Sequence, residues 1–414
     1  MSRPPIMRVS GLDHPSLNGL YVDNWGTYSG QYGGWIECWQ EAPDVTQWQW
    51  RLYDDEEDVL IFSAVTPSQD QFPAVDAWVE QSDVSADNLV IESAVIAITS
   101  SSDAQMINYT AATLLAHYKQ TQDITYIGTA SPIGTPSNRF RGIYDGQGYK
   151  IYNWSSGTTY LTDRGFFGQV QKATIVNVHL RNSTLYSDGQ SGMLIGDAWG
   201  MTIVRDCSAT GVLYARYNNQ GGLIGRTSGG IVERCWSNVT LIGQTYRPNL
   251  VNLGGLIGTV ANWSLSMRVK DCFALGNVSG GANCDNVGGL IGQVTQDVKL
   301  TILNGYAKGL ASGRNAVGQL TGLDAGTKTQ NSYWISDNPA STSASGQRLS
   351  LAQGQERASY NGWNFRTVWN ISPSDNNGFP YLDVRPVPAM KGLFGLKKCL
   401  YGMAAYLFRK DASI

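Results

Sequence analysis

The sequence predicts an all-β protein with a parallel β-solenoid at its centre. The first observation is an internal repeat of 28 to 34 residues, marked by the phrase Gly-Gly-Leu-Ile-Gly and looser copies of it. The last glycines of the copies are Gly168, Gly196, Gly225, Gly258, Gly292 and Gly322. A period of this length is typical of solenoids, in which stacked units share one continuous core.

The second observation is that each repeat also contains short apolar runs of strand length. Examples are residues 204–207, 232–235 and 269–272, each of which ends in a cysteine. We expect three faces per coil, with equivalent residues stacked about 4.8 Å apart. We expect the paired glycines to form a corner with φ above zero. The leucine and isoleucine of each phrase form two columns, and the column that points inward belongs to the core.

Two further columns of the repeat carry alternating charges. Arg205, Glu233 and Lys270 share one column, and the residues that follow them share the next: Asp206, Arg234 and Asp271. We interpret both as a solvated or corner ladder that favours register by about a few tenths of a kcal/mol per exposed pair.

Residues 1–95 form a separate unit, which is rich in tryptophan. Short strands separated by Asn-Gly and Gly-Gly turns predict a small β domain, in which Trp48, Trp50 and Leu52 alternate on one face. The tryptophans suit either the core of this small domain or a platform for sugars, and we favour the core because a small β domain needs large aromatic side chains.

From residue 110 to 385 the chain resembles proteins with GLUG repeats. The resemblance rests on Pro-Ile-Gly at 132–134, the run 140–151, Gly-Phe-Phe-Gly at 165–168, the serial Gly-Gly-Leu-Ile-Gly phrases and the ending Phe-Pro-Tyr-Leu at 379–382. It implies a right-handed parallel β-helix, of a kind found in bacterial surface proteins, in the non-catalytic part of some bacterial immunoglobulin proteases and in phage virion proteins. These motifs are specific for a fold but not for a function.

Outside the N-terminal unit we predict four segments. Residues 96–139 are a linker or helical cap, with a helix within 101–120 that Thr110 caps. Residues 140–335 are the β-helix, and 336–385 are a C-terminal cap. Residues 386–414 form an apolar and basic tail.

We expect the tail to dock onto a partner protein, since an exposed apolar stretch normally marks an interaction site. The alternatives are an amphipathic segment on a membrane surface and a segment folded back on its own domain. The residues expected to dock are Leu393, Phe394, Leu400, Tyr401, Leu407 and Phe408.

Composition narrows the function classes. The net charge of −3 and the absence of a basic run before the tail argue against a nucleic-acid partner. No apolar stretch has the length of a membrane span, and the first residues do not resemble a secretory signal. Because Cys207, Cys235 and Cys272 share one column, we expect free core thiols rather than disulfides.

One column suggests a binding site. The aromatic residues Trp236, Phe273 and Tyr306 follow the cysteine column, and period-two alternation points them outward if the cysteines point inward. Such a line of aromatic rings suits a glycan or a protomer contact, although a covering loop would make it a local apolar cluster. The two longest repeats add Tyr246, Arg247 and Trp263 as further candidate contacts.

Catalytic and cofactor motifs are absent from the sequence. The three histidines lack zinc-ligand spacing, and no nucleophile elbow, phosphate loop or dinucleotide fingerprint occurs. We therefore assign no catalytic residue, no metal and no cofactor. Polysaccharide cleavage needs only two nearby carboxylates, for which Asp197, Asp285 and Asp297 are candidates. The sequence therefore leaves enzyme activity open and favours a non-enzymatic function.

These observations together predict a phage virion protein, a tail fibre or tailspike component. It would be made in the host cytoplasm without a signal peptide, bind other tail proteins, present a surface to a host glycan and, by analogy, form a homotrimer. The alternatives are a polysaccharide depolymerase on the same scaffold and a bacterial cell-surface adhesin.

Overall fold

The computed structural model describes residues 95–382, apart from 109–112, 245–249, 262–265 and 297, together with the backbone of eight strands between Ile6 and Ser93. These eight strands form one antiparallel sheet in the order β7-β6-β5-β4-β3-β2-β1-β8. Their bounds are β1 (Ile6–Ser10), β2 (Gly19–Asn24), β3 (Thr27–Gly30), β4 (Trp35–Trp39), β5 (Trp48–Asp54), β6 (Val59–Thr66), β7 (Val79–Glu80) and β8 (Val90–Ser93).

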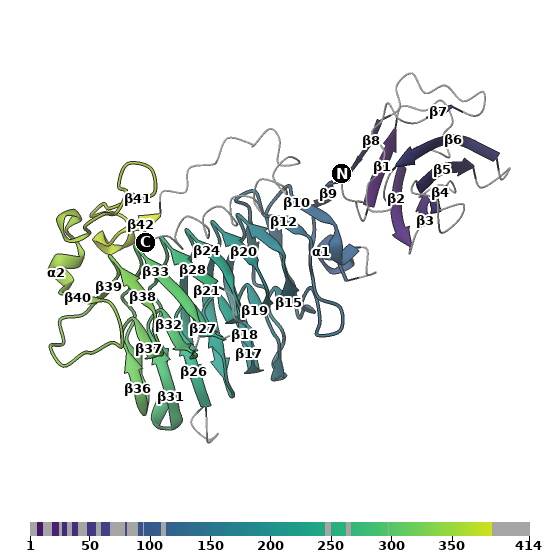
Figure 1. Ribbon diagram of the computed structural model, residues 1–414. Coiled ribbons are helices and arrows are strands. Elements are labelled where there is room, and N and C mark those ends of the chain that lie inside the picture. Colours follow the sequence, from purple (N-terminus) through teal and green to yellow (C-terminus); the bar gives the residue numbers. More distant parts are fainter. Residues whose placement is uncertain are drawn as a thin grey trace.

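Most of the remaining described chain is a parallel β-solenoid, and Figure 1 shows strands of successive turns lying side by side along it. One face is a nine-stranded parallel sheet that starts at Val95, ahead of residue 140 where the sequence places the first repeat. Its strands are β9 (Val95–Ile98), β10 (His117–Gln120), β12 (Ile143–Asp145), β16 (Thr174–Val176), β20 (Thr202–Arg205), β24 (Gly230–Glu233), β28 (Ser266–Lys270), β33 (Lys299–Leu303) and β38 (Lys328–Gln330).

A second face is a twelve-stranded parallel sheet, which contains the longest strands of the solenoid. Its strands are β11 (Ile124–Thr125), β13 (Lys150–Tyr152), β14 (Leu161–Thr162), β17 (His179–Gly189), β21 (Ser208–Ala215), β25 (Trp236–Gly243), β29 (Phe273–Ala274), β30 (Val278–Ser279), β34 (Tyr306–Ala307), β35 (Ala311–Ser312), β39 (Tyr333–Ile335) and β40 (Gln347–Leu349).

A third sheet has six strands and a fourth has five short ones, so each complete coil has four strand positions where the sequence predicted three. The six-stranded sheet contains β15 (Phe167–Gln171), β19 (Ile195–Trp199), β23 (Ile224–Thr227), β27 (Ile257–Val260), β32 (Ile291–Val294) and β37 (Thr321–Asp324). The five-stranded sheet contains β18 (Ser191–Gly192), β22 (Gln220–Gly221), β26 (Leu250–Gly254), β31 (Cys284–Gly288) and β36 (Asn315–Gly318).

Each Gly-Gly-Leu-Ile-Gly phrase joins the five-stranded sheet to the six-stranded sheet. Gly221 ends β22, and Ile224 begins β23 on the next side. Leu223 and Ile224 are both fully buried, so the leucine and the isoleucine columns both belong to the core. The turn between two strands places consecutive side chains inside, which strict alternation along one strand would forbid.

The glycines of this phrase serve a different purpose from the predicted one. None of them is among the glycines with positive φ. Instead, a Cβ atom on Gly258 would lie 2.5 Å from the backbone nitrogen of Gln220 and 2.6 Å from the carbonyl oxygen of Gly225. The predicted left-handed corner is therefore wrong here: the glycines let neighbouring backbones approach closely.

Left-handed conformations occur at two other corners, and most of the residues there are asparagine or aspartate. Asn177, Asp206, Arg234, Asp271 and Asn304 precede strands of the twelve-stranded sheet with φ between 50° and 56°. Their side chains form a ladder between coils: Asn304 Nδ2 donates to Asp271 Oδ1 over 3.1 Å, and Arg234 forms a two-pronged ion pair with Asp206. This confirms that the charged column is a corner ladder.

The two α-helices lie near opposite ends of the solenoid (Figure 1). The α1 helix (Ser101–Met106) begins after Ser100, whose side chain accepts a hydrogen bond from the backbone N–H of Asp103. Ser100 is therefore its cap, and the predicted cap Thr110 lies outside the described residues. The other helices of the described residues are η3 (Thr113–Leu115), η4 (Gly281–Asn283), α2 (Leu351–Gly354), η5 (Arg357–Ser359) and η6 (Asn376–Gly378).

At the C-terminal end, the segment 357–382 folds back over the solenoid and ends in the antiparallel pair β41 (Trp369–Asn370) and β42 (Tyr381–Leu382). Neither α-helix of the described residues has the length that a bilayer crossing requires. Four cysteines, Cys207, Cys235, Cys272 and Cys284, are free and buried, which confirms the prediction of core thiols for the cysteine column.

Candidate binding surface

A row of three tyrosines lies on the outer side of the twelve-stranded sheet. Tyr186 of β17 and Tyr214 of β21 are partners in register, and their rings stack with 4.7 Å between centroids and 18° between planes. Tyr160 packs edge-on against Tyr186 at 5.3 Å. All three side chains are partly exposed. We call Tyr160, Tyr186 and Tyr214 the tyrosine row.

The ring faces in this row are largely occupied. The face of Tyr160 lies 3.3 Å from the guanidinium carbon of Arg216, which also approaches Asp188 to 3.9 Å. The rings of Tyr186 and Tyr214 face each other. Stacking between coils therefore turns ring edges rather than ring faces to solvent. This geometry suits contacts to ring edges and phenol groups better than the stacking of a flat sugar face on an aromatic ring.

The three aromatic residues predicted as a binding line form a second stack on the same sheet. Ring centroids lie 5.7 Å apart between Trp236 and Phe273 and 5.1 Å apart between Phe273 and Tyr306, with the planes within 9° of parallel. They point away from the main core, as alternation predicted. However, Phe273 is 3% exposed and Tyr306 is fully buried.

The C-terminal segment is what buries this stack. Trp363, Trp369 and Phe379 pack on it as part of one apolar cluster. The hydroxyl of Tyr306 donates to the carbonyl oxygen of Pro380 over 2.6 Å and accepts from Asn376 Nδ2 over 2.9 Å. The expected exposure is therefore wrong for Phe273 and Tyr306, and the alternative of a covered cluster is correct for them. Trp236 is partly exposed, with Arg181 5.1 Å from its ring.

The remaining predicted contacts cannot be placed by the structure. Tyr246, Arg247 and Trp263 lie outside the described residues, as do all six residues of the predicted docking tail: Leu393, Phe394, Leu400, Tyr401, Leu407 and Phe408. Asp297 also lies outside them.

The two described carboxylates named for polysaccharide cleavage are both paired. Asp197 is 1% exposed and binds Arg226 through both oxygens, while Asp285 binds Arg314 through both of its oxygens. Hydrogen bonding to Arg314 lowers the pKa of Asp285. The two lie three coils apart, which is about 14 Å at the usual strand spacing. Glycosidases hold their two carboxyl groups about 5 to 9.5 Å apart, so this pair does not fit.

Asp197 belongs to a polar cluster on the outer side of the six-stranded sheet. The indole nitrogen of Trp199 donates to Asp197 over 2.8 Å, and the guanidinium groups of Arg139 and Arg226 lie 4.8 and 5.1 Å from the Trp199 ring. Nearby, burial is the main cause that raises the pKa of Asp163. The charges and ring faces of this cluster satisfy each other, which indicates a structural role.

Glu233 is the centre of the charged ladder on the nine-stranded sheet. Its carboxylate lies 3.0 Å from Arg205 and 3.1 Å from Lys270, which occupy the same position in the neighbouring coils. Burial opposes ionisation of Glu233, but the charges of Arg234, Arg205 and Lys270 outweigh it and lower its pKa. The ladder therefore stabilises the register of three coils.

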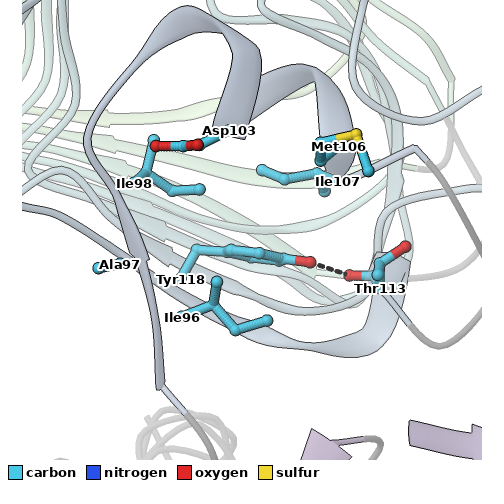
Figure 2. Close-up of a pocket in the computed structure, with 8 residues that line it drawn as sticks. All are labelled: Ile96, Ala97, Ile98, Asp103, Met106, Ile107, Thr113 and Tyr118. Atoms are coloured by element: carbon cyan, nitrogen blue, oxygen red, sulfur yellow. Dashed lines mark hydrogen bonds between the residues drawn. The ribbon is translucent and has the colours of Figure 1, made fainter. Parts of the chain in front are cut away.

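A cavity of about 160 Å³ lies beneath α1 at the N-terminal end of the solenoid (Figure 2). Most of its lining is apolar and comes from β9 and α1, and the ring of Tyr118 forms one wall. Its polar groups are engaged: Tyr118 donates to the carbonyl oxygen of Thr113 over 2.7 Å, and Asp103 accepts from Thr99. The cavity resembles a packing gap at the end of a stack.

Within the part of the chain that the structure describes, no three His, Cys, Asp or Glu side chains gather as they would around a metal ion. Sequence reasoning missed the tyrosine row. The signal was present in the sequence, since Tyr186 and Tyr214 occupy equivalent positions in successive repeats.

Comparison with known proteins gives relatives but no family assignment. No family model matches the chain. It is 24% identical over 189 residues to an immunoglobulin A1 protease of Streptococcus pneumoniae, covering 46% of this chain and 9% of that protein. It is 25% identical over 218 residues to an immunoglobulin A1 protease of Streptococcus sanguinis, covering 52% of this chain and 11% of that protein. The chain thus spans about a tenth of the length of these relatives.

Among solved structures, the chain is similar to a candidate immunoglobulin A1 protease from Bacteroides ovatus, with a TM-score of 0.51 and 16% identity. The match covers 69% of this chain and 91% of that one. At this identity the likeness shows the fold alone, a right-handed parallel β-helix, and confirms the predicted fold class.

The predicted function and location are wrong. The relatives are bacterial proteins named immunoglobulin A1 protease, whereas the sequence analysis predicted a tail fibre or tailspike in a virion. The reason is that a glycine-rich β-helix occurs in several settings, so the fold does not select among them. The first residues of this sequence also say nothing about where the protein is located, because the chain corresponds to only a small part of the length of its relatives.

Proposed function

We propose that the chain is a β-helical module of a bacterial surface or secreted protein of the immunoglobulin A1 protease type. In this role it contributes no peptide-bond cleavage. It acts as a stiff spacer that holds other parts of such a protein, or its binding surfaces, at a set distance.

The observation that supports this proposal most directly is the extent of the likeness to the Bacteroides ovatus structure, which reaches over 91% of that chain. The similarity to the streptococcal proteases also spans about half of this chain and only a tenth of theirs. A match of that size fits one module of a long protein better than a whole protease.

The architecture suits a spacer. One apolar core runs through the stacked coils from Ile98 to Leu320. The α1 helix lies at one end of the stack, and the segment around Trp369 packs at the other. Solenoids of this kind are stiff along their axis because each coil contacts its neighbours over all faces.

We further propose that the repeats are of the GLUG type, since the three Gly-Gly-Leu-Ile-Gly phrases occupy the same corner in their successive coils. A host glycan as partner and a homotrimeric assembly stay predictions. So does docking by the tail.

Two measurements test the proposal, and the first concerns location in the bacterium that produces the chain. Intact cells are treated with an added protease, and the chain is followed by a specific antibody in cells and culture medium beside a cytosolic marker protein. We expect the chain in the medium, or degraded while the marker stays intact. Detection only in the protected, cytosolic fraction would refute the surface or secreted location.

The second measurement concerns catalysis. The purified chain is incubated with human immunoglobulin A1, and the heavy chain is examined by electrophoresis beside a sample containing an active protease. We expect an intact heavy chain. Cleavage by the purified chain would contradict the role of a non-catalytic module.

A further inference from the structure

Seven asparagines of the chain begin an Asn-x-Ser/Thr triplet, the acceptor pattern for N-linked sugars. They are Asn108, Asn153, Asn182, Asn238, Asn262, Asn277 and Asn370. Such triplets also arise by chance, so the pattern identifies a site only where the fold leaves the side chain accessible.

Three of the seven lie in one row on the outer side of the twelve-stranded sheet. The backbone N–H of Asn153 donates to Arg181, the residue before Asn182. The backbone N–H of Asn182 in turn donates to the hydroxyl of Thr210, whose partner in register is Asn238. Asn153, Asn182 and Asn238 are all exposed, and their carboxamides have no hydrogen-bond partner among the described residues.

The asparagines that build the corner ladders show the opposite behaviour. Nδ2 of Asn252 donates to Asn219 and Nδ2 of Asn286 donates to Asn252, each over 2.8 Å. Neither these residues nor Asn177 and Asn304 of the other corner begin a triplet. The asparagines of the corner ladders are thus bonded and lack the pattern, whereas the three in the row have the pattern and unbonded carboxamides.

The remaining described triplets are less suitable. The carboxamide of Asn108 bonds to Pro132 and Gly134 through its two polar atoms. Oδ1 of Asn277 accepts from the backbone of Leu310, and Oδ1 of Asn370 accepts from that of Ile371. Attachment of a sugar at these positions would disturb contacts that the fold uses.

The hydroxyl of the triplet distinguishes the three members of the row. The hydroxyl of Ser155, which belongs to the Asn153 triplet, accepts a hydrogen bond from the backbone of Gly157. Those of Thr184 and Thr240 have no partner among the described residues. Asn182 and Asn238 lie two coils apart, about 10 Å at the usual strand spacing, which leaves room for a sugar on each.

We propose that Asn182 and Asn238 are acceptor sites for N-linked sugars. A separate glycosyltransferase forms the bond between the carboxamide Nδ2 and the anomeric carbon of a sugar activated by a diphosphate. The bond from that carbon to the diphosphate oxygen breaks, the diphosphate group leaves with the electron pair, and one Nδ2 proton passes to a base of the transferase. No oxidant or reductant takes part.

Sugars on Asn182 and Asn238 would change the outer surface of the twelve-stranded sheet. Asn182, Thr184 and Tyr186 alternate along β17 and therefore face the same side of the sheet. Sugars on Asn182 and Asn238 would stand beside the tyrosine row and cover part of it. The outer side of this sheet would then present carbohydrate instead of ring edges.

The test is peptide mass mapping of the full chain purified from the bacterium that produces it. We expect peptides with Asn182 and Asn238 to carry added sugar mass and peptides with Asn219 and Asn252 to carry none. Thr184→Ala and Thr240→Ala should each abolish the sugar at its own site, while Thr184→Ser and Thr240→Ser should keep it.

Unmodified Asn182 and Asn238 peptides in the native chain would overturn the proposal, and so would sugar that survives both Thr→Ala changes. Incubating unmodified chain with the soluble fraction and a nucleotide sugar, or with the membrane fraction alone, distinguishes a nucleotide-linked donor from a lipid-linked one. The inference is independent of the proposed function, because sugar attachment and surface location are measured separately.

Discussion

The indole nitrogen of Trp369 donates a hydrogen bond of 3.0 Å to Oδ1 of Asp271, although 98 positions separate the two residues. Asp271 is a corner residue of the solenoid with φ of 51°, and it is 3% exposed. This contact fastens the C-terminal segment to the corner ladder. The same contact explains why the outward-pointing aromatic residue Phe273 is covered: Trp369 packs on its ring at the start of the next strand.

Trp369→Phe should lower the free energy of unfolding by about 1 to 3 kcal/mol, because it leaves a buried carboxylate oxygen with one hydrogen bond fewer. Urea denaturation followed by circular dichroism measures this loss. Trp334→Phe is the matched control, since the indole nitrogen of Trp334 is buried without a hydrogen-bond partner. An equal loss in both variants would contradict a specific role for the Trp369–Asp271 hydrogen bond.

Gly258→Ala and Gly258→Asn should both destabilise the chain, by about 1 to 3 kcal/mol or more, because any Cβ atom meets the backbone of the preceding coil. Glycine could be required at this position for a left-handed conformation or for close approach of two backbones. Asparagine tolerates the left-handed conformation but carries a Cβ atom, so Gly258→Asn distinguishes these two requirements. Gly128→Asn is the control, as Gly128 has φ of 79° and open space around its Cα. Full tolerance of Gly258→Asn in thermal unfolding would show that backbone conformation, not close approach, requires glycine there.

Glu233→Gln should reduce stability at neutral pH by about 2 kcal/mol, since it removes the charge shared by Arg205 and Lys270. The folded state lowers the pKa of Glu233. Its ionisation therefore contributes stability above the unfolded pKa, about 4.3, and this contribution disappears as the pH falls through the lower folded value. The variant and the native chain should converge in stability at low pH. A constant difference across that range would argue against the charge ladder.

The cysteines of the core should not react in the native state. Burial raises the pKa of Cys207 and Cys272, and it raises that of Cys284 to about 12. The thiolate is the reactive form, so these three thiols offer little nucleophile, and burial keeps a thiol reagent away from all four core cysteines, Cys235 included. In a variant with Cys38→Ser and Cys399→Ser, we expect no labelling before unfolding and four thiols afterwards. Rapid labelling of the native variant would contradict this packing.

Columns within the repeat were predictable because equivalent residues repeat at almost constant spacing. The period identified the parallel stacking, the buried cysteine column and the ladder of Glu233 with Arg205 and Lys270. The tyrosine row was equally visible in the repeat, but nothing local indicated that its rings would face each other. The conformation of the Gly-Gly-Leu-Ile-Gly glycines was mispredicted because glycine suits both left-handed corners and close backbone contacts.

The exposure of the aromatic column was not predictable from the repeat. Alternation decides the side of a strand to which Phe273 and Tyr306 point, but not what lies on that side. Trp363, Trp369 and Phe379 come from a segment 57 to 106 positions later in the chain, and their approach depends on how the last coil turns back. Function was less predictable still, since the relatives alone excluded a virion protein.

The sequence by itself determined the stacking of this protein. A repeat with apolar residues at fixed offsets has one way to bury them all, which is to pile coil on coil in register. Only the tertiary structure decided which outward residues meet solvent, because that depends on contacts between segments far apart in sequence. It covered Phe273 and Tyr306 with the C-terminal segment, paired Asp197 with Arg226, and left Asn182, Asn238 and the tyrosine row on the surface.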